Sequence, residues 1–451
     1  MARSSQTYID SFLKDFGERH AAEPEFVQSV REVAGSLGGL LDKHPEYQDA
    51  AILERISEPE RLIQFRVAWT DDAGKVQINR GYRVQFSSLL GPYKGGLRFH
   101  PSVNRSVLQF LGFEQIFKNS LTGLWLGGAK GGADFDPKGK SDAEVMRFCQ
   151  AFITELANYI GPDTDVPAGD IGVGSREIGY MFGQYKKLAG EFHGSLTGKG
   201  VDWGGSNLRP EATGYGLVYF VEAMLQERDD SLDGKTVAIS GAGNVAQYAA
   251  QKALQQGATV LTMSDSDGTI YDADGIDNEK LQYIMKLKNA ERGRIREYAN
   301  KYETAEFKEG QAPWGVKADV YLPCATQNEL DEAGAKQLVV HKPLIVAEGA
   351  NMPTTPEAYQ VLRQAGIAFG PGKASNAGGV AVSGLEMAQN SSRTQWSHED
   401  VDERLQSIMQ DIHAKCVKYG KDDTGATDYV RGANAAGFQR VAQAMLSQGI
   451  V

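Results

Sequence analysis

The chain has 451 residues, of which 41% are hydrophobic and 23% charged, proportions that are typical of a globular enzyme and exclude a disordered chain. Its net charge of −11, without a block rich in lysine and arginine, excludes the usual footprint of a nucleic-acid-binding protein. At about 150 residues per domain, the length predicts two or three domains. No apolar run approaches the ~18 residues that span a bilayer, and the N-terminus lacks a signal-peptide core. We therefore expect a cytoplasmic protein without a membrane segment.

The cysteine and histidine positions argue against a disulfide framework or a metal site. The three cysteines, Cys149, Cys324 and Cys416, lie far apart and are odd in number, so they suggest neither a paired framework nor a CxxC site. The seven histidines form neither an HExxH motif nor a cluster with cysteine. We therefore expect no metal in the protein.

The first half of the chain is predicted to mix helices and strands. Residues 1–60 place apolar side chains among charged ones at helical spacing. Residues 61–86 alternate apolar and polar side chains on both sides of a turn signal at Asp71–Gly74, which indicates strands. Helical spacing returns over residues 103–121 and 142–160. This order of elements predicts an α/β domain.

Beyond residue 205 the pattern changes to short apolar runs that alternate with helical stretches. Continuous apolar strands separated by helices indicate a parallel sheet that is covered on both faces. We place a domain boundary near residue 205 and expect the last helix, Gly432–Gln448, to pack back on the first domain. The predicted strands are Thr236–Ser240, Thr259–Ser264, Asp319–Leu322, Leu344–Ala347 and Ile367–Gly370.

The sequence around residue 241 predicts a dinucleotide site. A strand at Lys235–Ser240 runs directly into Gly241-Ala-Gly-Asn-Val-Ala246, and a helix follows from about Val245 to Gly257. Gly241 allows a tight turn, Gly243 lets the backbone approach a pyrophosphate, and the start of the helix offers N–H donors. A lone GxGxxA motif is a weak signal. Strand, motif, helix and a second strand in this order favour a dinucleotide over a chance glycine turn.

Asp265, at the end of that second strand, occupies the usual place of a carboxylate that binds the ribose hydroxyls. Such a carboxylate repels a 2′-phosphate and by itself favours NAD. Nearby side chains could instead bind the phosphate of NADP, although they are equally consistent with a solvated helix face. These side chains are Ser264, Ser266, Lys286, Lys288 and Arg292.

Polar residues also follow later strands of the predicted sheet, in Cys324–Asn328 and Glu348–Asn351. Ligands bind outside the carboxyl ends of parallel strands, so these residues are candidates for contacts to the ribose and nicotinamide. Ala325, Thr326 and Asn351 are the candidate positions within them. Caps on the helices that follow are the alternative interpretation.

Three segments before residue 205 combine many glycines with a few charged side chains: Gly91–His100, Gly127–Pro137 and Pro167–Gly174. We expect glycine-rich turns that bring the backbone close to a ligand and confine the side chains of Lys130 and Asp170. Burial lowers the pKa of a lysine, which turns a counter-ion into a possible base.

Gln115 and Lys118 lie three positions apart and share one face of a predicted helix, where an amide and an ammonium could bind one carboxylate. Taken alone, such a pair more often belongs to a solvated surface. Lys94, Lys130 and Asp170 lie in the neighbouring glycine-rich segments. Together these side chains favour an anionic substrate.

Six motifs resemble the glutamate dehydrogenase family, most of all its short, hexameric bacterial and fungal type. They occur in order through nearly the whole chain and read GPYKGGLRFHPSVN, GLWLGGAKGGADFDPKGKS, PAGDIGVGSREIG, LPCATQNEL, VAEGANMPTTPEA and GPGKASNAGGVAVSGLEM. The resemblance implies a two-domain α/β fold and a homohexamer. Residues 1–205, joined by the C-terminal helix 430–451, would form a mixed-sheet domain for substrate binding and oligomerisation. Residues 206–429 would form a doubly wound, Rossmann-like dinucleotide-binding domain.

The resemblance also implies roles for the matching residues. Lys130 resembles the catalytic lysine that activates the water attacking the imine, and Asp170 resembles the carboxylate that shuttles protons to and from the substrate nitrogen. The expected substrate contacts are Gln115 and Lys118 for the α-carboxylate, Lys94 and Ser383 for the distal carboxylate, and Arg209. The expected cofactor contacts are Thr213, Gly241, Gly243, Asn244, Val245, Ser264, Asp265, Ser266, Lys288, Ala325, Thr326, Asn351 and Asn376.

For the short type, Ser264-Asp265-Ser266 is compatible with NADP, so the resemblance reverses the preference for NAD, which stays the alternative. The implied reaction is the reversible reductive amination of 2-oxoglutarate with ammonium, in which NADPH supplies the hydride and L-glutamate forms. Lys130 would act as a base in its neutral form, and the neighbouring ammonium groups would lower its pKa in that direction.

Two rival functions are open at this point. A dehydrogenase for an apolar amino acid such as leucine or phenylalanine would share Lys130, Asp170 and the nucleotide fold. Lys94 and Ser383 argue against it, because an apolar side chain would leave a buried cation unpaired. An inactive protein that senses NADP or glutamate would have no use for Lys130 and Asp170. A structural or nucleic-acid-binding role has no support in the sequence.

Overall fold

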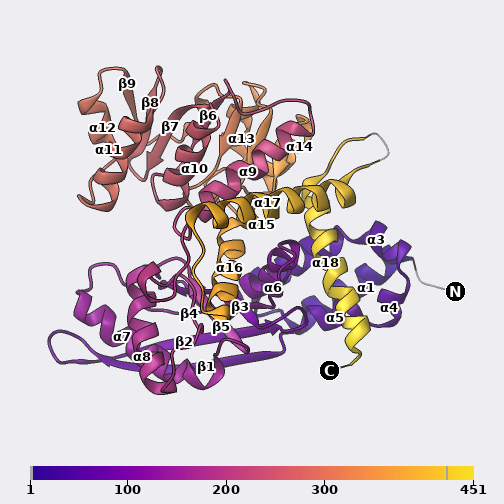
Figure 1. Cartoon of the computed structure of the whole chain (residues 1–451). Coiled ribbons are helices and arrows are strands. Elements are labelled where there is room, and N and C mark those ends of the chain that lie inside the picture. Colours follow the sequence, from indigo (N-terminus) through magenta and orange to yellow (C-terminus); the bar gives the residue numbers. More distant parts are fainter. Residues whose placement is uncertain (1–3, 423–424, 451) are drawn as a thin grey trace. The chain divides into compact units, whose positions relative to one another are not determined.

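The computed structural model describes residues 4–422 and 425–450 of the chain, which folds into two compact units (Figure 1). Unit 1 comprises the chain up to Arg209, Val380–Val401 and the chain from Asn434 onward. Unit 2 comprises Pro210–Gly379 and Asp402–Ala433. Residues 380–401 therefore belong to unit 1, whereas the sequence interpretation placed all of 206–429 in one second domain.

Residues 380–401 belong to unit 1 because polar side chains of helix α16 (Gly378–Ser392) form a hydrogen bond and an ion pair with that unit. Arg209 Nε donates to Ser383 Oγ at 3.1 Å, and Lys199 Nζ lies 2.6 Å from Glu386 Oε1. Polar contacts of this kind do not change the pattern of apolar residues along the sequence. A domain boundary drawn from that pattern therefore could not assign residues 380–401 to unit 1.

Unit 1 begins with short helices, as the sequence predicts. Ser4 caps the first of them by accepting a hydrogen bond from the N–H of Thr7, and Pro24 occupies the first turn of the second. The buried rings of Phe16 and Phe26 pack edge to face, with centroids 5.3 Å apart. These helices are α1 (Ser5–Arg19), α2 (Pro24–Gly35), α3 (Gly38–Lys43), α4 (Glu46–Asp49) and α5 (Ile52–Ile56).

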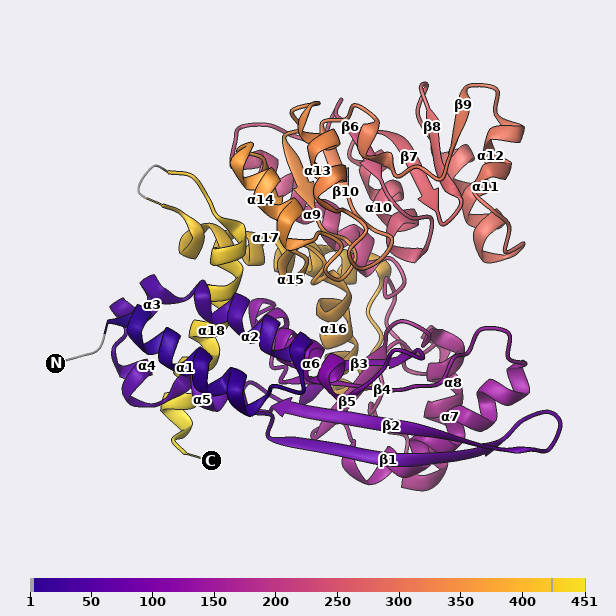
Figure 2. The ribbon, with the colours of Figure 1, turned by 180° about the vertical axis from the view of Figure 1, so that it is seen from behind.

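A five-stranded mixed sheet forms the centre of unit 1, in the order β1-β2-β4-β3-β5. The pairs β1–β2 and β2–β4 are antiparallel, whereas β3 runs parallel to both β4 and β5. Figure 2 shows the long β1–β2 hairpin that the alternating segment and its turn signal predicted. The strands are β1 (Arg61–Thr70), β2 (Val76–Ser87), β3 (Tyr93–Phe99), β4 (Gly128–Ala133) and β5 (Asp165–Gly169).

Helices cover both faces of this sheet. On one face, α7 (Asp142–Leu156) and α8 (Ser175–Ala189) enclose an apolar core with Leu97 and Phe99 of β3. On the other face lies α6 (Arg105–Leu121), whose Gly112 comes close to Phe86 of β2 and to Lys130 of β4. Because successive side chains of a strand point to opposite faces, Lys94, Gly96 and Arg98 of β3 point away from the apolar core.

The glycine-rich segments were expected to be turns, and this prediction is wrong for most of the first two, which form the strands β3 and β4. In the third segment Pro167–Gly169 ends strand β5, and a turn follows at Asp170–Val173. The glycines of the first two segments let strands approach one another. A Cβ on Gly95 would lie 1.6 Å from the carbonyl oxygen of Ala129. Gly132 has a φ of +152° and a Cβ on it would lie 2.0 Å from the carbonyl oxygen of Arg98. Glycine is therefore required by neighbouring backbone here.

A fully buried ion pair links β2 to β5. Arg83 donates through its guanidinium to both carboxylate oxygens of Asp165, at 2.9 and 2.5 Å, and to the carbonyl oxygen of Gly95 at 3.1 Å. Gln85 adds a hydrogen bond to Asp165 at 3.0 Å. Bidentate pairing of this kind compensates for the loss of hydration only while both partners are present.

Unit 2 contains a seven-stranded sheet in the order β12-β11-β10-β6-β7-β8-β9. The five predicted strands are confirmed and run parallel, whereas the antiparallel strands β8 and β9 were not predicted. The sheet is therefore mixed at one edge. Its strands are β6 (Thr236–Ile239), β7 (Thr259–Asp265), β8 (Gly268–Asp272), β9 (Ala305–Glu309), β10 (Val320–Leu322), β11 (Ile345–Ala347) and β12 (Ala368–Gly370).

The parallel part of this sheet is doubly wound. Helices α13 (Glu332–Val339) and α14 (Pro356–Gln364) pack on one face around Tyr321 and Val346. Helices α9 (Ala212–Gln226) and α10 (Asn244–Gln255) pack with each other and contact β11 and β6. The strand order reverses between β6 and β10, and such a switch point is where open α/β sheets bind ligands.

The remaining helices are α11 (Asn278–Asn289), α12 (Arg296–Lys301), α15 (Gly372–Ser375), α17 (His398–Gly420) and α18 (Tyr429–Gln448). The part of α18 that belongs to unit 1 contacts its N-terminal helices, since the ring of Phe438 packs against Tyr47. Within residues 4–422 and 425–450, no helix combines the length and apolar character that a membrane crossing requires.

We predict that Asp165→Asn destabilises unit 1 by about 3–5 kcal/mol, because it leaves the buried Arg83 guanidinium without its counter-charge. Circular dichroism during urea and thermal unfolding measures the change as lower midpoints. Asp72→Asn is the matched control, because it opens the exposed Arg147–Asp72 pair and should move the midpoints little. Equal midpoints for both variants would contradict the importance of the buried pair.

Candidate active site

Lys130 and Asp170 form an ion pair inside unit 1, and Arg98 joins them. Lys130 lies on β4 and its Nζ is 3.0 Å from Oδ2 of Asp170, which directly follows β5. Arg98, on β3, brings its Nε to 2.8 Å from the same oxygen. The structure thus brings together the two residues that were expected to carry the chemistry, and it adds a third that was not expected.

Glycines on neighbouring elements make room for this pair. A Cβ on Gly96 of β3 would lie 2.9 Å from the Cβ of Asp170 and 3.4 Å from Nζ of Lys130. On α6, a Cβ on Gly112 would lie 3.7 Å from the Cβ of Lys130. A larger side chain at position 96 would push the ammonium and the carboxylate apart.

Burial and charge set the protonation of the pair. Burial lowers the pKa of Lys130, the carboxylate of Asp170 opposes this, and the guanidinium of Arg98 adds to the lowering. Burial alone would raise the pKa of Asp170, but Lys130 and Arg98 together hold it well below its usual range. Asp170 is therefore ionised at neutral pH, and Lys130 gives up its proton more readily than an exposed lysine.

Gln115 and Lys118 share a face of α6, as the sequence predicts, but they do not lie on a solvated surface. Both side chains are partly buried. Burial and the neighbouring Lys130 ammonium lower the pKa of Lys118 to about 8. Gln115 donates to Asn119 at 2.6 Å, and Asn119 in turn donates to the carbonyl oxygen of Lys94 at 3.0 Å. These bonds fix α6 against β3.

Lys94 is 1% exposed, and its ammonium group donates hydrogen bonds to uncharged groups of unit 1. Its Nζ donates to the carbonyl oxygen of Val166 at 3.0 Å and to Thr197 Oγ1 at 2.7 Å. An ammonium has three N–H donors, so one remains for a ligand. Burial lowers the pKa of Lys94 well below its ordinary value, and Glu386 opposes this.

Arg209 and Ser383 lie near Lys94. Arg209 Nε donates to Ser383 Oγ at 3.1 Å, and the charge of Arg209 influences the pKa of both Lys94 and Lys118. The structure therefore groups the five residues expected to bind substrate with the Lys130–Asp170 pair. Five lysine and arginine side chains face fewer carboxylates here, which favours an anionic ligand.

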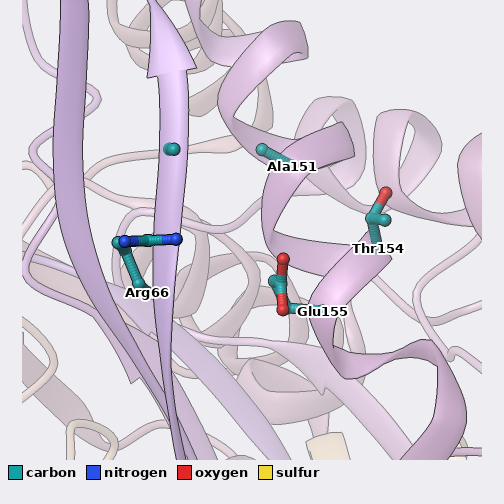
Figure 3. A pocket seen from close by; sticks show the side chains of 5 residues that line it. Arg66, Ala151, Thr154 and Glu155 are labelled. Carbon is teal, nitrogen blue, oxygen red and sulfur yellow. The ribbon is translucent and has the colours of Figure 1, made fainter.

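A separate hollow of about 400 Å³ lies over β1 and α7 in unit 1 (Figure 3). Arg66, Ala68, Ala151, Thr154 and Glu155 line it. None of the residues grouped around Lys130 lines this hollow, so we place the chemistry at the buried charges. Within the described ranges, no three His, Cys, Asp or Glu side chains come together to hold a metal ion.

The glycine turn predicted for a dinucleotide follows β6 in unit 2. Gly241 has a φ of +84°, and a Cβ on it would lie 3.1 Å from the Cα of Ala325. Around Gly243, by contrast, a Cβ would meet no heavy atom within 4 Å. Gly243 is also the N-cap of α10 and offers no side chain to its first N–H groups. Asn244 and Val245 begin this helix. The arrangement fits the pyrophosphate of a dinucleotide.

Asp265 accepts hydrogen bonds from three groups of its own unit, which bears on the argument that its charge favours NAD. Its Oδ2 accepts from Nζ of Lys288 at 3.0 Å and from the N–H of Ile295 at 2.9 Å, while Oδ1 accepts from the N–H of Asp267 at 3.0 Å. Burial by itself would raise the pKa of Asp265, but the combined effect of these donors is larger, so its pKa lies below the usual value and the carboxylate is ionised. Its charge is compensated by Lys288 and repels a phosphate less.

The serines on either side of Asp265 have different partners. Ser264 Oγ accepts from the N–H of Gly241 at 2.8 Å, so it fixes the glycine turn. Ser266 Oγ accepts from Arg294 at 2.8 Å, which places a guanidinium where the sequence interpretation considered Lys286 and Arg292. Lys286 instead pairs with Glu291 at 3.1 Å on the surface.

Asn351 and Asn376 meet beyond the ends of β11 and β12. Nδ2 of Asn376 donates to Oδ1 of Asn351 at 3.1 Å and to the carbonyl oxygen of Ala350 at 2.9 Å. Beside them, Glu348 accepts from the N–H of Gly372 at 2.6 Å, and burial raises the pKa of Glu348 to about 7. These polar groups lie at the carboxyl ends of the parallel strands, as the sequence predicts.

Ala325 and Thr326 follow β10 and are exposed. The N–H of Ala325 donates to Glu329 at 2.8 Å, and the close approach of Ala325 to Gly241 places both at the switch point. Thr213 lies in the first turn of α9 and is partly buried.

Comparison with known proteins supports one family. Residues 59–187 match the family described as Glu/Leu/Phe/Val dehydrogenase, dimerisation domain, and residues 204–449 match Glutamate/Leucine/Phenylalanine/Valine dehydrogenase. The NAD(P)-specific glutamate dehydrogenase of Xylanibacter ruminicola is 62% identical over 95% of this chain and 96% of its own length. The chain belongs to the glutamate dehydrogenase family.

Other relatives in the glutamate dehydrogenase family differ in the coenzyme that their names specify. The NADP-specific enzyme of Escherichia coli (strain K12) is 57% identical over 99% of this chain and all of its own length. The NAD-specific enzyme of Bacteroides fragilis is 55% identical over 98% of this chain and all of its own length. Similarity over the whole chain thus does not separate the two coenzymes.

Solved glutamate dehydrogenase structures have the same fold. The enzyme of Plasmodium falciparum matches with a TM-score of 0.97 at 51% identity, over 99% of this chain and 96% of its own. The hetero-hexameric enzyme of Thermus thermophilus, in its leucine-bound form, matches with a TM-score of 0.81 at 29% identity, over 92% and 98%. These matches confirm the predicted α/β fold of two domains.

The sequence interpretation missed three polar contacts of this site. Arg98 was detectable, because it lies two and four positions after Gly96 and Lys94 and so shares their face of a strand. Glu386 was detectable too, because it lies three positions after Ser383 on one face of α16. Thr197 carries no such signal, and only the fold brings it to Lys94.

We predict that Lys118 titrates near pH 8, because burial and the Lys130 ammonium lower its pKa. Competitive acetylation followed by mass spectrometry of the peptides measures the pH at which this lysine becomes half reactive. In Lys130→Met the midpoint should rise, since the repelling charge is gone. A midpoint in the range of a free lysine, about 10.4, in the unsubstituted protein would contradict the description of this site.

Proposed function

We propose that this protein catalyses the reversible reductive amination of 2-oxoglutarate with ammonium to L-glutamate, with NADPH as the hydride donor. One observation carries the proposal. The Lys130–Asp170 ion pair lies in the same unit as two groups of carboxylate-binding side chains, Lys94 with Ser383 and Gln115 with Lys118. A dicarboxylate substrate needs both groups, one for each carboxylate. The reaction at its keto carbon needs the Lys130–Asp170 pair to transfer protons.

Lys94 and Ser383 bind the distal carboxylate of the substrate. Lys94 has one N–H donor beyond those given to Val166 and Thr197, and burial makes a charge-assisted bond to it strong. Arg209 holds the hydroxyl of Ser383 in place. Gln115 and Lys118 bind the α-carboxylate, because they present an amide and an ammonium from one face of α6.

Lys130 and Asp170 move protons around the keto carbon. Ammonia adds to the ketone, water leaves, and the iminium accepts a hydride, which bound NADPH supplies. In the reverse direction neutral Lys130 takes a proton from the water that attacks the imine. Asp170 exchanges protons with the substrate nitrogen. The lowered pKa of Lys130 suits a base, and Asp170 is ionised before ammonia arrives.

The residues of unit 2 suit NADP, with NAD as the alternative. Gly243 and the start of α10 would hold the pyrophosphate. Ser266, with the guanidinium of Arg294 beside it, would bind the 2′-phosphate of NADP, since the charge of Asp265 is compensated by Lys288. Ala325, Thr326, Asn351 and Asn376 would contact the ribose and nicotinamide.

We further infer a homohexamer that works in the cytoplasm, with unit 1 as the substrate and oligomerisation domain and unit 2 as the dinucleotide-binding domain. Residues 59–187 match a dimerisation domain, and the related enzyme of Thermus thermophilus is hetero-hexameric. The ten-residue edge strand β1 supports self-association, because only one of its two sides pairs with another strand of the sheet.

The decisive experiment follows the absorbance of reduced nicotinamide with purified protein, 2-oxoglutarate and ammonium, supplying NADPH and NADH in parallel. We expect oxidation that stops when either substrate is omitted and that is faster with NADPH. Lys130→Ala should still bind 2-oxoglutarate but should not turn over. Activity only with a monocarboxylic 2-oxo acid, or none with any coenzyme in the folded protein, would refute the proposal.

We predict that Lys94→Leu lowers kcat/KM for 2-oxoglutarate about 100-fold or more, equivalent to about 3 kcal/mol, because the distal carboxylate loses a buried charged partner. The same variant should gain activity with a monocarboxylic 2-oxo acid such as 2-oxo-4-methylpentanoate, since the pocket becomes apolar. Lys94→Arg, which keeps the charge, is the control. Unchanged kinetics in Lys94→Leu would remove Lys94 from the substrate site.

A further inference from the structure

Arg98 is the part of this site to which neither the sequence nor the proposed reaction gave a role. It lies on β3, is 6% exposed, and its Nε donates to Oδ2 of Asp170 at 2.8 Å. Nζ of Lys130 lies 3.0 Å from that same oxygen. Two cations thus share one oxygen of a carboxylate that has two.

The other oxygen, Oδ1 of Asp170, accepts no hydrogen bond from any residue in the described ranges. A carboxylate oxygen offers lone pairs that favour a donor. The donor that the proposed reaction brings to Asp170 is the substrate nitrogen, which carries N–H groups as ammonia, as iminium and as amine. The geometry therefore leaves one oxygen for the protein and one for the substrate.

We propose that Arg98 is a positioning residue for the proposed reaction: it binds Oδ2 of Asp170 next to Lys130 and so keeps Asp170 ionised, with Oδ1 available to the substrate nitrogen. The inference rests on the proposed function, because it assumes that Asp170 exchanges protons with that nitrogen. Arg98 itself need not touch the substrate.

An arginine suits this position better than a lysine would. Guanidinium groups stay charged over the pH range in which proteins work, whereas burial lowers the pKa of the neighbouring Lys118 and Lys130, which can lose their charge. A fixed charge in contact with Asp170 therefore holds the carboxylate ionised even after Lys130 has given up its proton. With a titrating neighbour alone, Asp170 would lose its compensation in the middle of the reaction.

The backbone fixes Arg98 where it is needed. Arg98 pairs in register with Gly132 of β4, and a Cβ on Gly132 would lie 2.0 Å from the carbonyl oxygen of Arg98. No side chain can stand between the two strands at this point. Gly96, two residues earlier on the same face of β3, leaves the space in which Lys130 and Asp170 meet.

Other charges around the pair cannot replace Arg98. Arg83 of β2 lowers the pKa of Lys130, but its own charge is matched by the buried Asp165 of β5. Lys118 of α6 is coupled to Lys130 and Asp170, but its pKa is about 8, so it loses charge in the working range. Of Arg83, Lys118 and Arg98, it is Arg98 that donates a hydrogen bond to Asp170, and it does so through a guanidinium.

The test uses Arg98→Gln, which keeps an N–H donor and removes the charge, and Arg98→Lys, which keeps the charge. Arg147→Gln is the matched control, because it breaks another arginine–carboxylate pair of unit 1, that of Arg147 with Asp72. Two curves are measured for each protein. One is the pH dependence of kcat/KM for 2-oxoglutarate, and the other is the pH dependence of acetylation of Lys130.

In Arg98→Gln we expect both curves to move to higher pH by about one unit or more, because a neighbouring cation shifts a pKa by about 1–3 units. On the acidic limb each unit of displacement lowers the rate about tenfold. Arg147→Gln should leave both curves within about 0.3 units of the unsubstituted protein. Arg98→Lys should move them by less than one unit, because a buried lysine keeps its charge only below its own lowered pKa. A purely structural role would lower the rate without moving either curve.

Unmoved curves in Arg98→Gln, or a curve displaced by a full unit in Arg98→Lys, would overturn the proposal. If Arg98→Gln does not fold, as judged by circular dichroism, the result for Arg98→Lys still decides. The acetylation curve needs no turnover, so failure of the proposed function is distinguishable. In that case the unsubstituted protein would not oxidise NADPH, while the Lys130 curve would still report whether Arg98 acts on the pair.

Discussion

Lysine ammonium groups cost several kcal/mol to remove from water unless a partner compensates for their hydration, and unit 1 brings several of them together. Lys94 is compensated by a carbonyl and a hydroxyl, and Lys130 by a carboxylate. The sheet order that makes β3 the neighbour of both β4 and β5 supplies these partners. An anionic ligand compensates for the remaining positive charge. The empty site therefore lowers the stability of the fold, and the same charges raise the affinity for a dianion.

The parallel strands of unit 2 could be predicted from the sequence because a strand buried on both faces is a short run of consecutive apolar residues, as in Ile345–Ala347. The strands of unit 1 that carry the site were missed. Glycine is a poor strand former, and the reason for its use in β3 and β4, contact with neighbouring backbone, exists only in the folded sheet. Strands β8 and β9 lack a long apolar run, so nothing in their composition set them apart from loops.

The site could be predicted where its residues act near their own segment, as with Gln115 and Lys118 on one helix face. Partners contributed by distant segments could not. Ser383 entered through resemblance alone, and its place beside Arg209 depends on the return of residues 380–401 to unit 1. The partners of Asp265 could not be predicted for the same reason, since Lys288 and Ile295, which donate hydrogen bonds to it, lie 23 and 30 residues further along the chain.

The glycine contacts of β3 and β4 have a consequence for how this protein can change over time. A single added methyl at Gly95 or Gly132 meets a carbonyl oxygen at 1.6 or 2.0 Å, so the strands that hold the catalytic pair are closed to variation. The helices α6 and α16 contribute side chains to the same place without such contacts at Gln115 or Ser383. New substrate ranges are therefore open to selection, or to a protein engineer, through these helices and through side chains such as Lys94, while the glycines of the strands preserve the reaction.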